Sequence, residues 1–154
     1  MDSTISELVS KDGISFRTIA KSSALRRLFK SEFGNLPKCH TAIRRRFMAY
    51  GEQIQTEKIA QIQKYLAGGG KYSLTIDEWT AKNNRRYLNI NIHDKNSFRL
   101  NLGLEPIPTE FTSVECLRLV KKRLSKYGID LLTHIVGCTN DGASIMQKYG
   151  HISG

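Results

Sequence analysis

The sequence lacks long hydrophobic runs and has few cysteines. No segment approaches the ~18 consecutive apolar residues that a transmembrane helix needs. The N-terminus, MDSTISELVS, is polar and acidic, unlike a secretory signal. The three cysteines, Cys39, Cys116 and Cys138, are far apart, and neither they nor the four histidines have the spacing of zinc ligands. We therefore expect an intracellular protein with free thiols that is not secreted and has neither a membrane segment nor a zinc site.

Basic residues are in clear excess. The 154-residue chain has 24 Lys+Arg against 14 Asp+Glu, a net charge of +10. Residues 1–71 hold 13 basic and 6 acidic residues, whereas residues 72–154 hold 11 and 8. Lys and Arg that neutralise phosphates release counterions and so bind nucleic acid without sequence specificity. The charge therefore favours a polyanionic partner, DNA, and the alternative is a protein that is merely basic.

The first part of the chain, residues 1–70, has the hydrophobic period of helices. Arg44, Arg45 and Arg46 stand in a row within a predicted helix, so at least one of them faces solvent or a phosphate. They are the candidate DNA-binding residues of this segment, and a solvated helix face is the alternative. As a nuclear-import signal three residues are a weak pattern.

The glycines Gly68–Gly70, followed by Lys71, invite comparison with a phosphate-binding P-loop. That loop requires G-x-x-x-x-G-K-[ST] between a strand and a following helix, whereas here Tyr72 follows the lysine and a strand follows the glycines. We predict a helix C-cap and a flexible turn at this point.

From residue 71 onward the period changes to the alternation of β-strands. Strands are expected around 73–77, 87–93 and 98–104, and Asp94–Ser97 is expected to form a hairpin between the last two. One face of the third strand should carry every second residue: Phe98, Leu100, Leu102 and Leu104.

A helix should follow over 113–127, with Thr112 and Glu115 at capping-box spacing. Its last turns carry Lys121, Lys122, Arg123 and Lys126, where cations suit the helix dipole. The apolar run from Leu131 predicts a fourth strand buried on both faces, and a short helix should begin at Ala143. The fold class is therefore α/β or α+β: a helical segment, residues 1–70, and a mixed sheet in the order β-β-β-α-β-α, residues 71–154.

Two strands end in an aspartate. A strand entered through a crossover helix is usually parallel to the strand that it joins. If the fourth strand lies parallel to the first, Asp77 and Asp141 emerge at the same end of neighbouring strands, ~4.8 Å apart. Two carboxylates so placed can share one divalent cation, as a phosphoryl-transfer site requires. Turn or cap residues are the alternative for each aspartate taken alone.

These segments carry a resemblance. SLTIDEWTAKNNRRYLNINIHD, NLGLEPI and GIDLLTHIVGCTNDGASIMQKYG resemble the RNase H-like catalytic core of hAT-superfamily DNA transposases. Thr75, Asp77, Trp79 and Thr80 match the family motif T-x-D-x-W-[TS] on the first strand. Thr139, Asp141, Gly142 and Ala143 match T-x-D-G/N-A after the fourth strand, and residues 13–47 are more loosely similar to the region before the core.

The resemblance implies that Asp77 and Asp141 are catalytic metal ligands for Mg²⁺ or Mn²⁺. Thr75 and Thr139 belong to the same motifs and would support the site. Trp79 would shape the site floor or support its strand, and stacking on DNA is the alternative. His93 stands where family members often have a histidine, and we expect a hydrogen-bonded structural role. Glu78 alternates to the opposite side of the strand, so a cap or solvent role is expected.

The family's third acidic ligand lies far beyond the second aspartate and is missing here, as are the fifth strand and the dimerisation region. We therefore expect a truncated hAT transposase-like protein that is inactive alone, located in the nucleus, with DNA as partner, and forming homo-oligomers or associating with a full-length transposase. The alternatives are a DNA- or transposase-binding regulatory module, a complete nuclease that recruits Glu78 or Glu110, and a fragment that does not fold stably.

Overall fold

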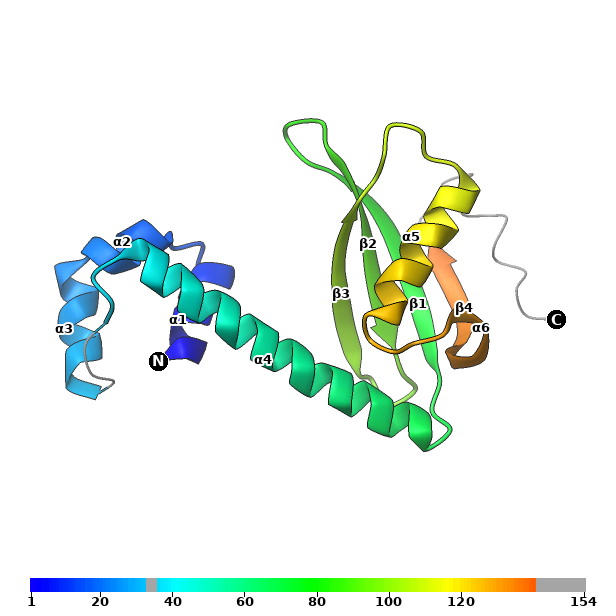
Figure 1. Ribbon diagram of the computed structural model, residues 1–154, viewed down its shortest axis with the longest axis horizontal. Helices are drawn as coiled ribbons and strands as arrows, with labels where there is room; N and C mark the ends of the chain where they lie inside the picture. The colour runs from blue at the N-terminus through cyan, green and yellow to red at the C-terminus, as the bar shows by residue number, and fades with distance from the viewer. Residues whose placement is uncertain (33–35, 141–154) are drawn as a thin grey trace. The chain divides into compact units, whose positions relative to one another are not determined.

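Two hydrophobic clusters organise the chain, and each belongs to a separate compact unit. The first unit is Met1–Lys58 and the second begins at Ile59, inside the longest helix. The computed structural model describes residues 1–32 and 36–140 (Figure 1). Helices and a mixed four-stranded sheet make an α+β fold, as predicted.

The first unit contains α1 (Asp2–Ser10), α2 (Phe16–Lys21), α3 (Ser23–Glu32) and the first part of α4 (His40–Ala67). The Ser15 hydroxyl caps α2 by accepting the Thr18 N–H at 3.0 Å. The buried core of this unit draws on all four helices and the segment before α4: Ile5, Ile19, Ala20, Phe29, Leu36 and Ile43.

Arg26 ties this unit together. Its guanidinium donates to the carbonyl of Ala20, to that of Leu36 at 3.2 Å and to that of Pro37 at 3.2 Å. These carbonyls lie outside α3, so one side chain satisfies backbone groups at the end of α2 and in the segment before α4. Arg26 is therefore a structural residue of the fold.

The second unit is built on a sheet in the order β3-β2-β1-β4. Its strands are β1 (Tyr72–Thr80), β2 (Arg86–His93), β3 (Arg99–Pro106) and β4 (Ile135–Asn140). β1 pairs antiparallel with β2, β2 pairs antiparallel with β3, and β4 lies parallel to β1. The predicted order β-β-β-α-β and the parallel fourth strand are confirmed, and the helix predicted from Ala143 lies outside the described residues.

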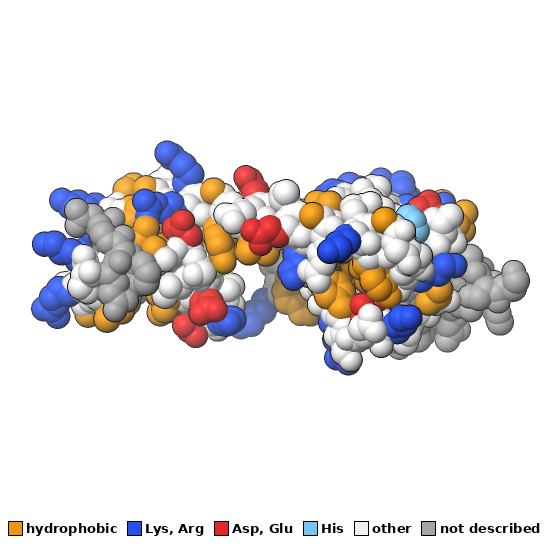
Figure 2. Space-filling view, turned by 90° about the horizontal axis from the view of Figure 1, so that it is seen from below, with side chains coloured by type: hydrophobic (Ala, Val, Ile, Leu, Met, Phe, Trp, Pro, Cys, Tyr) orange, Lys and Arg blue, Asp and Glu red, His pale blue; other side chains and the backbone are white. Residues whose placement is uncertain are grey.

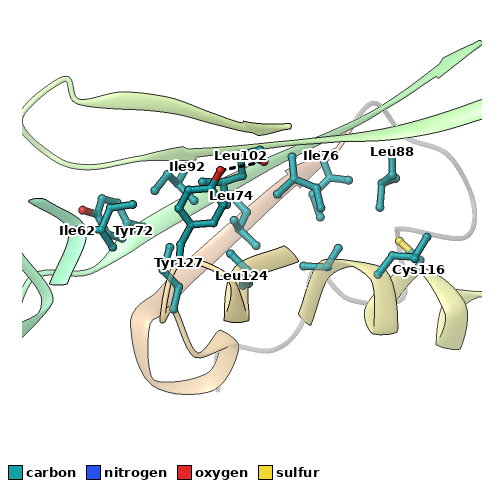
Figure 3. Packing of buried hydrophobic residues seen from close by; sticks show 14 residues of the cluster. Ile62, Tyr72, Leu74, Ile76, Leu88, Ile92, Leu102, Cys116, Leu124 and Tyr127 are labelled. Carbon is teal, nitrogen blue, oxygen red and sulfur yellow. Dashed lines mark hydrogen bonds between the residues drawn. The ribbon is translucent and has the colours of Figure 1, made fainter. Parts of the chain in front are cut away.

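Helix α5 (Ser113–Ser125) covers one face of this sheet (Figure 1). The Thr112 hydroxyl accepts the Glu115 N–H at 3.3 Å and begins the helix at the predicted cap. Figure 3 shows the core between α5 and the sheet, where the Tyr127 hydroxyl donates to the Leu102 carbonyl at 3.3 Å. Fully buried side chains of this core include Ile62, Tyr72, Leu74, Leu88, Ile90, Ile92, Leu102 and Leu124.

The alternation predicted for the third strand is wrong beyond Leu102. Ile92 pairs with Leu100, but Ile90 pairs with Gly103, so β3 holds one extra residue at a β-bulge. Gly103 has φ +102°, a backbone conformation that L side chains rarely adopt. After the bulge the two faces are exchanged: Leu104 is exposed and Glu105 is buried.

The fourth strand begins later than predicted. Leu131–His134 form a short helix, α6, because the Asp130 carboxylate accepts the N–H groups of Leu132 and Thr133 and caps it. Burial on both faces is also wrong for β4. Val136 is 55% exposed, and among the described strands β4 is at the edge of the sheet with β1 as its neighbour.

Lys and Arg are spread over the face in view in Figure 2, where Asp and Glu are fewer. The 28-residue α4 has a mixed polar and apolar composition along its length. Within residues 1–32 and 36–140, no helix combines the length and the apolar character needed to cross a membrane.

Candidate functional site

Strand β1 places Asp77 away from the hydrophobic core. Leu74 and Ile76 are buried against the core, so Thr75 and Asp77 point to the other face of the sheet. That polar sheet face comprises Ser73, Thr75, Asp77, Asn89, Asn91 and His93. Asp77 is half-buried, and its carboxylate has no hydrogen bond or ion pair with any residue that the structure describes. It is therefore available to a ligand.

The parallel neighbour β4 brings the second motif beside the first. Thr75 pairs with Thr139 and Ile76 with Asn140, the last described residue. The two threonines predicted to support the site thus lie opposite each other on adjacent strands; Thr75 is half-buried and Thr139 is exposed. Asp141, the second predicted metal ligand, lies outside the described residues.

Thr75 also connects to β2. Its Oγ1 atom is 2.9 Å from Nε2 of His93, which fixes the ring on the polar sheet face. His93 thus forms the hydrogen bond expected of a structural histidine. The contact orients Thr75 two residues before Asp77.

Trp79 ends β1 beside an aromatic neighbour. It pairs in register with Tyr87, and the ring centroids are 5.7 Å apart with an interplanar angle of 36°. Trp79 is 52% exposed. The pair supports the end of the strand and leaves much of the indole accessible beyond Asp77, since residues 77 and 79 share one face.

Glu78 lies on the opposite face and has a partner. Arg86 donates through Nε at 2.6 Å and Nη2 at 2.9 Å to its two carboxylate oxygens. The hydrogen bonds from Arg86, and secondarily its charge, lower the Glu78 pKa despite partial burial. A carboxylate held in this way on the other face of β1 is not placed to join Asp77 in binding a metal.

The basic cluster predicted at the end of α5 is partly neutralised inside the unit. Glu105 is buried and lies 2.8 Å from Arg123 Nη2, 3.1 Å from Lys122 Nζ and 3.6 Å from Lys126 Nζ. Sequence reasoning missed this carboxylate, because the predicted alternation put Leu104 on the apolar face and ended the strand before residue 105. The glycine at 103 is the one signal in the sequence that could have located the bulge.

The three candidate DNA-binding arginines lie on α4 in the first unit, and all are exposed. Arg46 Nη1 is 4.0 Å from the Asp2 carboxylate. Arg44 and Arg45 form no ion pair with any described residue. Two of the three predicted arginines are therefore free for an external anion.

The metal implied by the resemblance would require oxygen ligands on one strand edge. Among the described residues no three His, Cys, Asp or Glu side chains are grouped closely enough to hold an ion. Asp77 fits such a ligand in type and exposure, and the residues that would hold a divalent ion are Asp77 and Asp141. Comparison of the chain with protein-family models and with curated proteins finds no match in either.

Proposed function

We propose that the chain is a hAT transposase-like DNA-binding protein whose second unit corresponds to the first part of an RNase H-like catalytic core. One observation carries the proposal: β1 and β4 are adjacent, parallel and in a register that pairs Ile76 with Asn140. Asp77 and Asp141 are the residues that follow Ile76 and Asn140 in the sequence. Two motifs 64 positions apart in the sequence are therefore carried by neighbouring strands.

Asp77 and Asp141 would hold Mg²⁺ or Mn²⁺, which supplies electrostatic stabilisation of a phosphate oxygen. In this proposal Thr75 and Thr139, which pair with each other two positions before the aspartates, support the metal site. A third acid is needed for the family's chemistry, and neither Glu78 nor Glu105 can serve, because each is held by basic side chains away from Asp77. We therefore propose that the described part alone does not cleave DNA efficiently.

The proposed partner is DNA, and the proposed location is the nucleus. The exposed Arg44 and Arg45 support DNA binding by the first unit, since each phosphate contact by an unpaired cation releases a counterion. Association with a second copy or with a full-length transposase is part of the proposal, because neither Glu78 nor Glu105 is placed to act as the third acid beside Asp77.

The test is a thermal melt of the whole chain with and without millimolar Mn²⁺, followed by the fluorescence of Trp79. Metal at ~100 times its dissociation constant should stabilise the fold by about 2.7 kcal/mol. Asp77→Asn and Asp141→Asn should abolish that gain. Asp12→Asn is the matched control, because Asp12 is exposed in the other unit. Equal metal response in all four proteins would refute the metal site.

A second candidate is a DNA-binding regulatory module without catalysis. The observation that favours it is that the free arginines lie in a unit separate from Asp77. Oligonucleotide binding by Arg44→Gln/Arg45→Gln and by Asp77→Asn distinguishes the two. Loss of binding only in the arginine variant, together with no response to Mn²⁺, would establish the regulatory module in place of the metal site. A complete nuclease using Glu110 would instead show Mn²⁺-dependent plasmid nicking that Glu110→Gln removes.

A further inference from the structure

A hollow of about 870 Å³ lies in the second unit at the end of the sheet remote from Asp77. The turn between α4 and β1 forms one wall, and the β2–β3 hairpin forms another; both lie at the lower end of the sheet in Figure 1. We call it the turn hollow. Its lining includes Lys64, Tyr65, Lys71, Ser73, His93 and Lys95.

The glycine turn gives the hollow a defined wall. The Gly70 N–H donates to the Tyr65 carbonyl at 3.0 Å and the Gly69 N–H to the Leu66 carbonyl at 2.9 Å, with φ +79° at Gly69. These are the bonds of a Schellman C-cap, so the predicted cap is confirmed. A Cβ at Gly70 would lie 2.4 Å from the Tyr65 ring, so any other residue there would displace that ring.

The same bonds show that the hollow is not a P-loop. In a P-loop the backbone N–H groups point at the phosphate. Here the N–H groups of Gly68, Gly69 and Gly70 all donate to carbonyls of the last helical turn. These N–H groups therefore cannot donate to an anion. Their hydrogen bonds also satisfy carbonyl groups that would otherwise repel an anion. Any anion in the turn hollow must be held by side chains.

Those side chains are three lysines from three places in the chain. Lys64 comes from α4, Lys71 precedes β1 and Lys95 lies in the hairpin. All are exposed, and none has an ion pair with a described residue. The acid at the rim, Asp94, is committed to the hairpin, where its Oδ1 accepts the N–H groups of Asn96 at 2.7 Å and Phe98 at 2.8 Å.

The position of Lys64 can be explained without a ligand, because Lys64 lies in the last turn of α4 and cations stabilise the C-terminal end of a helix. The helix end does not account for Lys95, which is distant in the sequence and reaches the same hollow from the hairpin. Ser73 and His93 line the wall where the polar sheet face begins, and the Ser73 hydroxyl donates to the His93 carbonyl at 3.4 Å. The three cations around one hollow suit a phosphate group.

We propose that the turn hollow binds a backbone phosphate of DNA and so sets the path of a strand toward Asp77; this inference rests on the proposed function. Ser73 and Asp77 lie on one face of β1, four residues and ~13 Å apart. That span equals about four nucleotide steps along a DNA helix axis. The strand would cross the polar sheet face between the two ends of β1.

The test uses the full chain and a fluorescein-labelled duplex oligonucleotide. The variant is Lys64→Gln/Lys71→Gln/Lys95→Gln. Loss of the one phosphate contact should reduce the magnitude of the slope of log K against log[salt] by about 0.9. Between 50 and 200 mM salt the unmodified chain should therefore lose about 3.5-fold more affinity than the variant. Removal of the same charge at three scattered lysines, Lys11→Gln/Lys82→Gln/Lys121→Gln, is the control and should change the slope far less.

Equal slope changes in the two triple variants would overturn the inference and leave the proposed DNA binding intact. No binding by the unmodified chain would overturn both the DNA path and the proposed function. A titration with inorganic phosphate, followed by the amide resonances of Gly68–Lys71, separates the sources of the ligand. Shifts with free phosphate but not with the oligonucleotide would show a small-anion site, which also overturns the path for DNA.

Discussion

Replacing Glu105 by Gln removes one buried charge and leaves three cations around it. The Glu105 side chain is 3% exposed, and Arg123 is 15% exposed, whereas Lys122 and Lys126 are about half-exposed. Breaking a buried ion pair by removing one partner costs about 3–5 kcal/mol. Solvent can accommodate the two lysines, so only Arg123 stays buried without its partner. We expect Glu105→Gln to lower the free energy of unfolding of the second unit by about 2–3 kcal/mol.

The same carboxylate gives a pH dependence of known sign. Burial raises the Glu105 pKa, but the hydrogen bond from Lys122 and the charges of Arg123, Lys122 and Lys126 outweigh it, and the pKa is lowered overall. The stabilisation is therefore fully present above the unfolded pKa of about 4.3. It is lost as pH falls through the folded pKa, because the unfolded chain then binds the proton more readily. The Gln variant should lack this part of the acid sensitivity.

The assay is urea unfolding at pH 7 and at steps between pH 5 and 3, followed by fluorescence of Trp79. Since Trp79 is the single tryptophan and lies in β1, it reports on the second unit alone. With m of ~1–3 kcal/mol/M, the midpoint should fall by about 0.7–3 M. Glu115→Gln is the control, because Glu115 forms a surface pair with Arg118 that is worth less than about 1 kcal/mol. Equal midpoints for the Glu105 and Glu115 variants, or identical acid profiles with and without Glu105, would refute the reasoning.

Three further predictions concern positions that the structure constrains. Gly103→Ala should destabilise the second unit by more than ~1 kcal/mol, because φ +102° is strained for alanine, and an unchanged Trp79 unfolding midpoint would contradict this. Cys39 should react first with dithionitrobenzoate, since hydrogen bonds from Thr41 lower its pKa, whereas burial raises that of Cys116 to about 11; equal rates would contradict the assignment. Arg26→Lys should cost the first unit about 1.5–3 kcal/mol, because an ammonium cannot span three carbonyls, and circular dichroism melting that matches the unmodified chain would exclude it.

The topology of the second unit could be predicted from the sequence because each step rests on a local pattern. Alternating apolar residues located β1 and β2, and the capping pair at Thr112 located α5. The parallel placement of β4 then followed from the crossover rule. The alternation and the capping pair each involve residues close together in the sequence, so they can be recognised without knowing the tertiary structure.

The two errors have different causes: the register change in β3 depends on pairing with a distant strand, whereas the short helix α6 depends on a neighbouring residue. The bulge at Leu102 is defined by its pairing with β2, where Ile90 meets Gly103 and Asn91 meets Asn101. An alternation pattern cannot show an extra residue, because Leu104 continues the period in the sequence after the register has changed. α6 was missed for another reason: one capping carboxylate, Asp130, outweighs the strand preference of the apolar residues after it.

The candidate site was also predictable only in part. Asp77, Thr75 and Thr139 could be chosen from motif positions, and the structure places the two threonines opposite each other. The contact between Thr75 and His93 needed the cross-strand pairing of β1 and β2, in which residues 18 apart meet. The turn hollow needed three segments to converge, and its signal in the sequence, a lysine after three glycines, resembles a motif that it does not form.

Net charge alone does not show which basic side chains the protein offers to DNA. The fold itself uses Arg26 to tie carbonyls together, Arg86 to hold Glu78, and three α5 cations to neutralise Glu105. The exposed cations without an ion pair to a described residue include Arg44, Arg45, Lys64, Lys71 and Lys95. The salt slope of DNA binding should therefore fall when Arg44 or Lys64 is replaced by Gln and should not fall when Arg86 is replaced. An equal loss of slope in Arg86→Gln would contradict the assignment of Arg86 to the folded core.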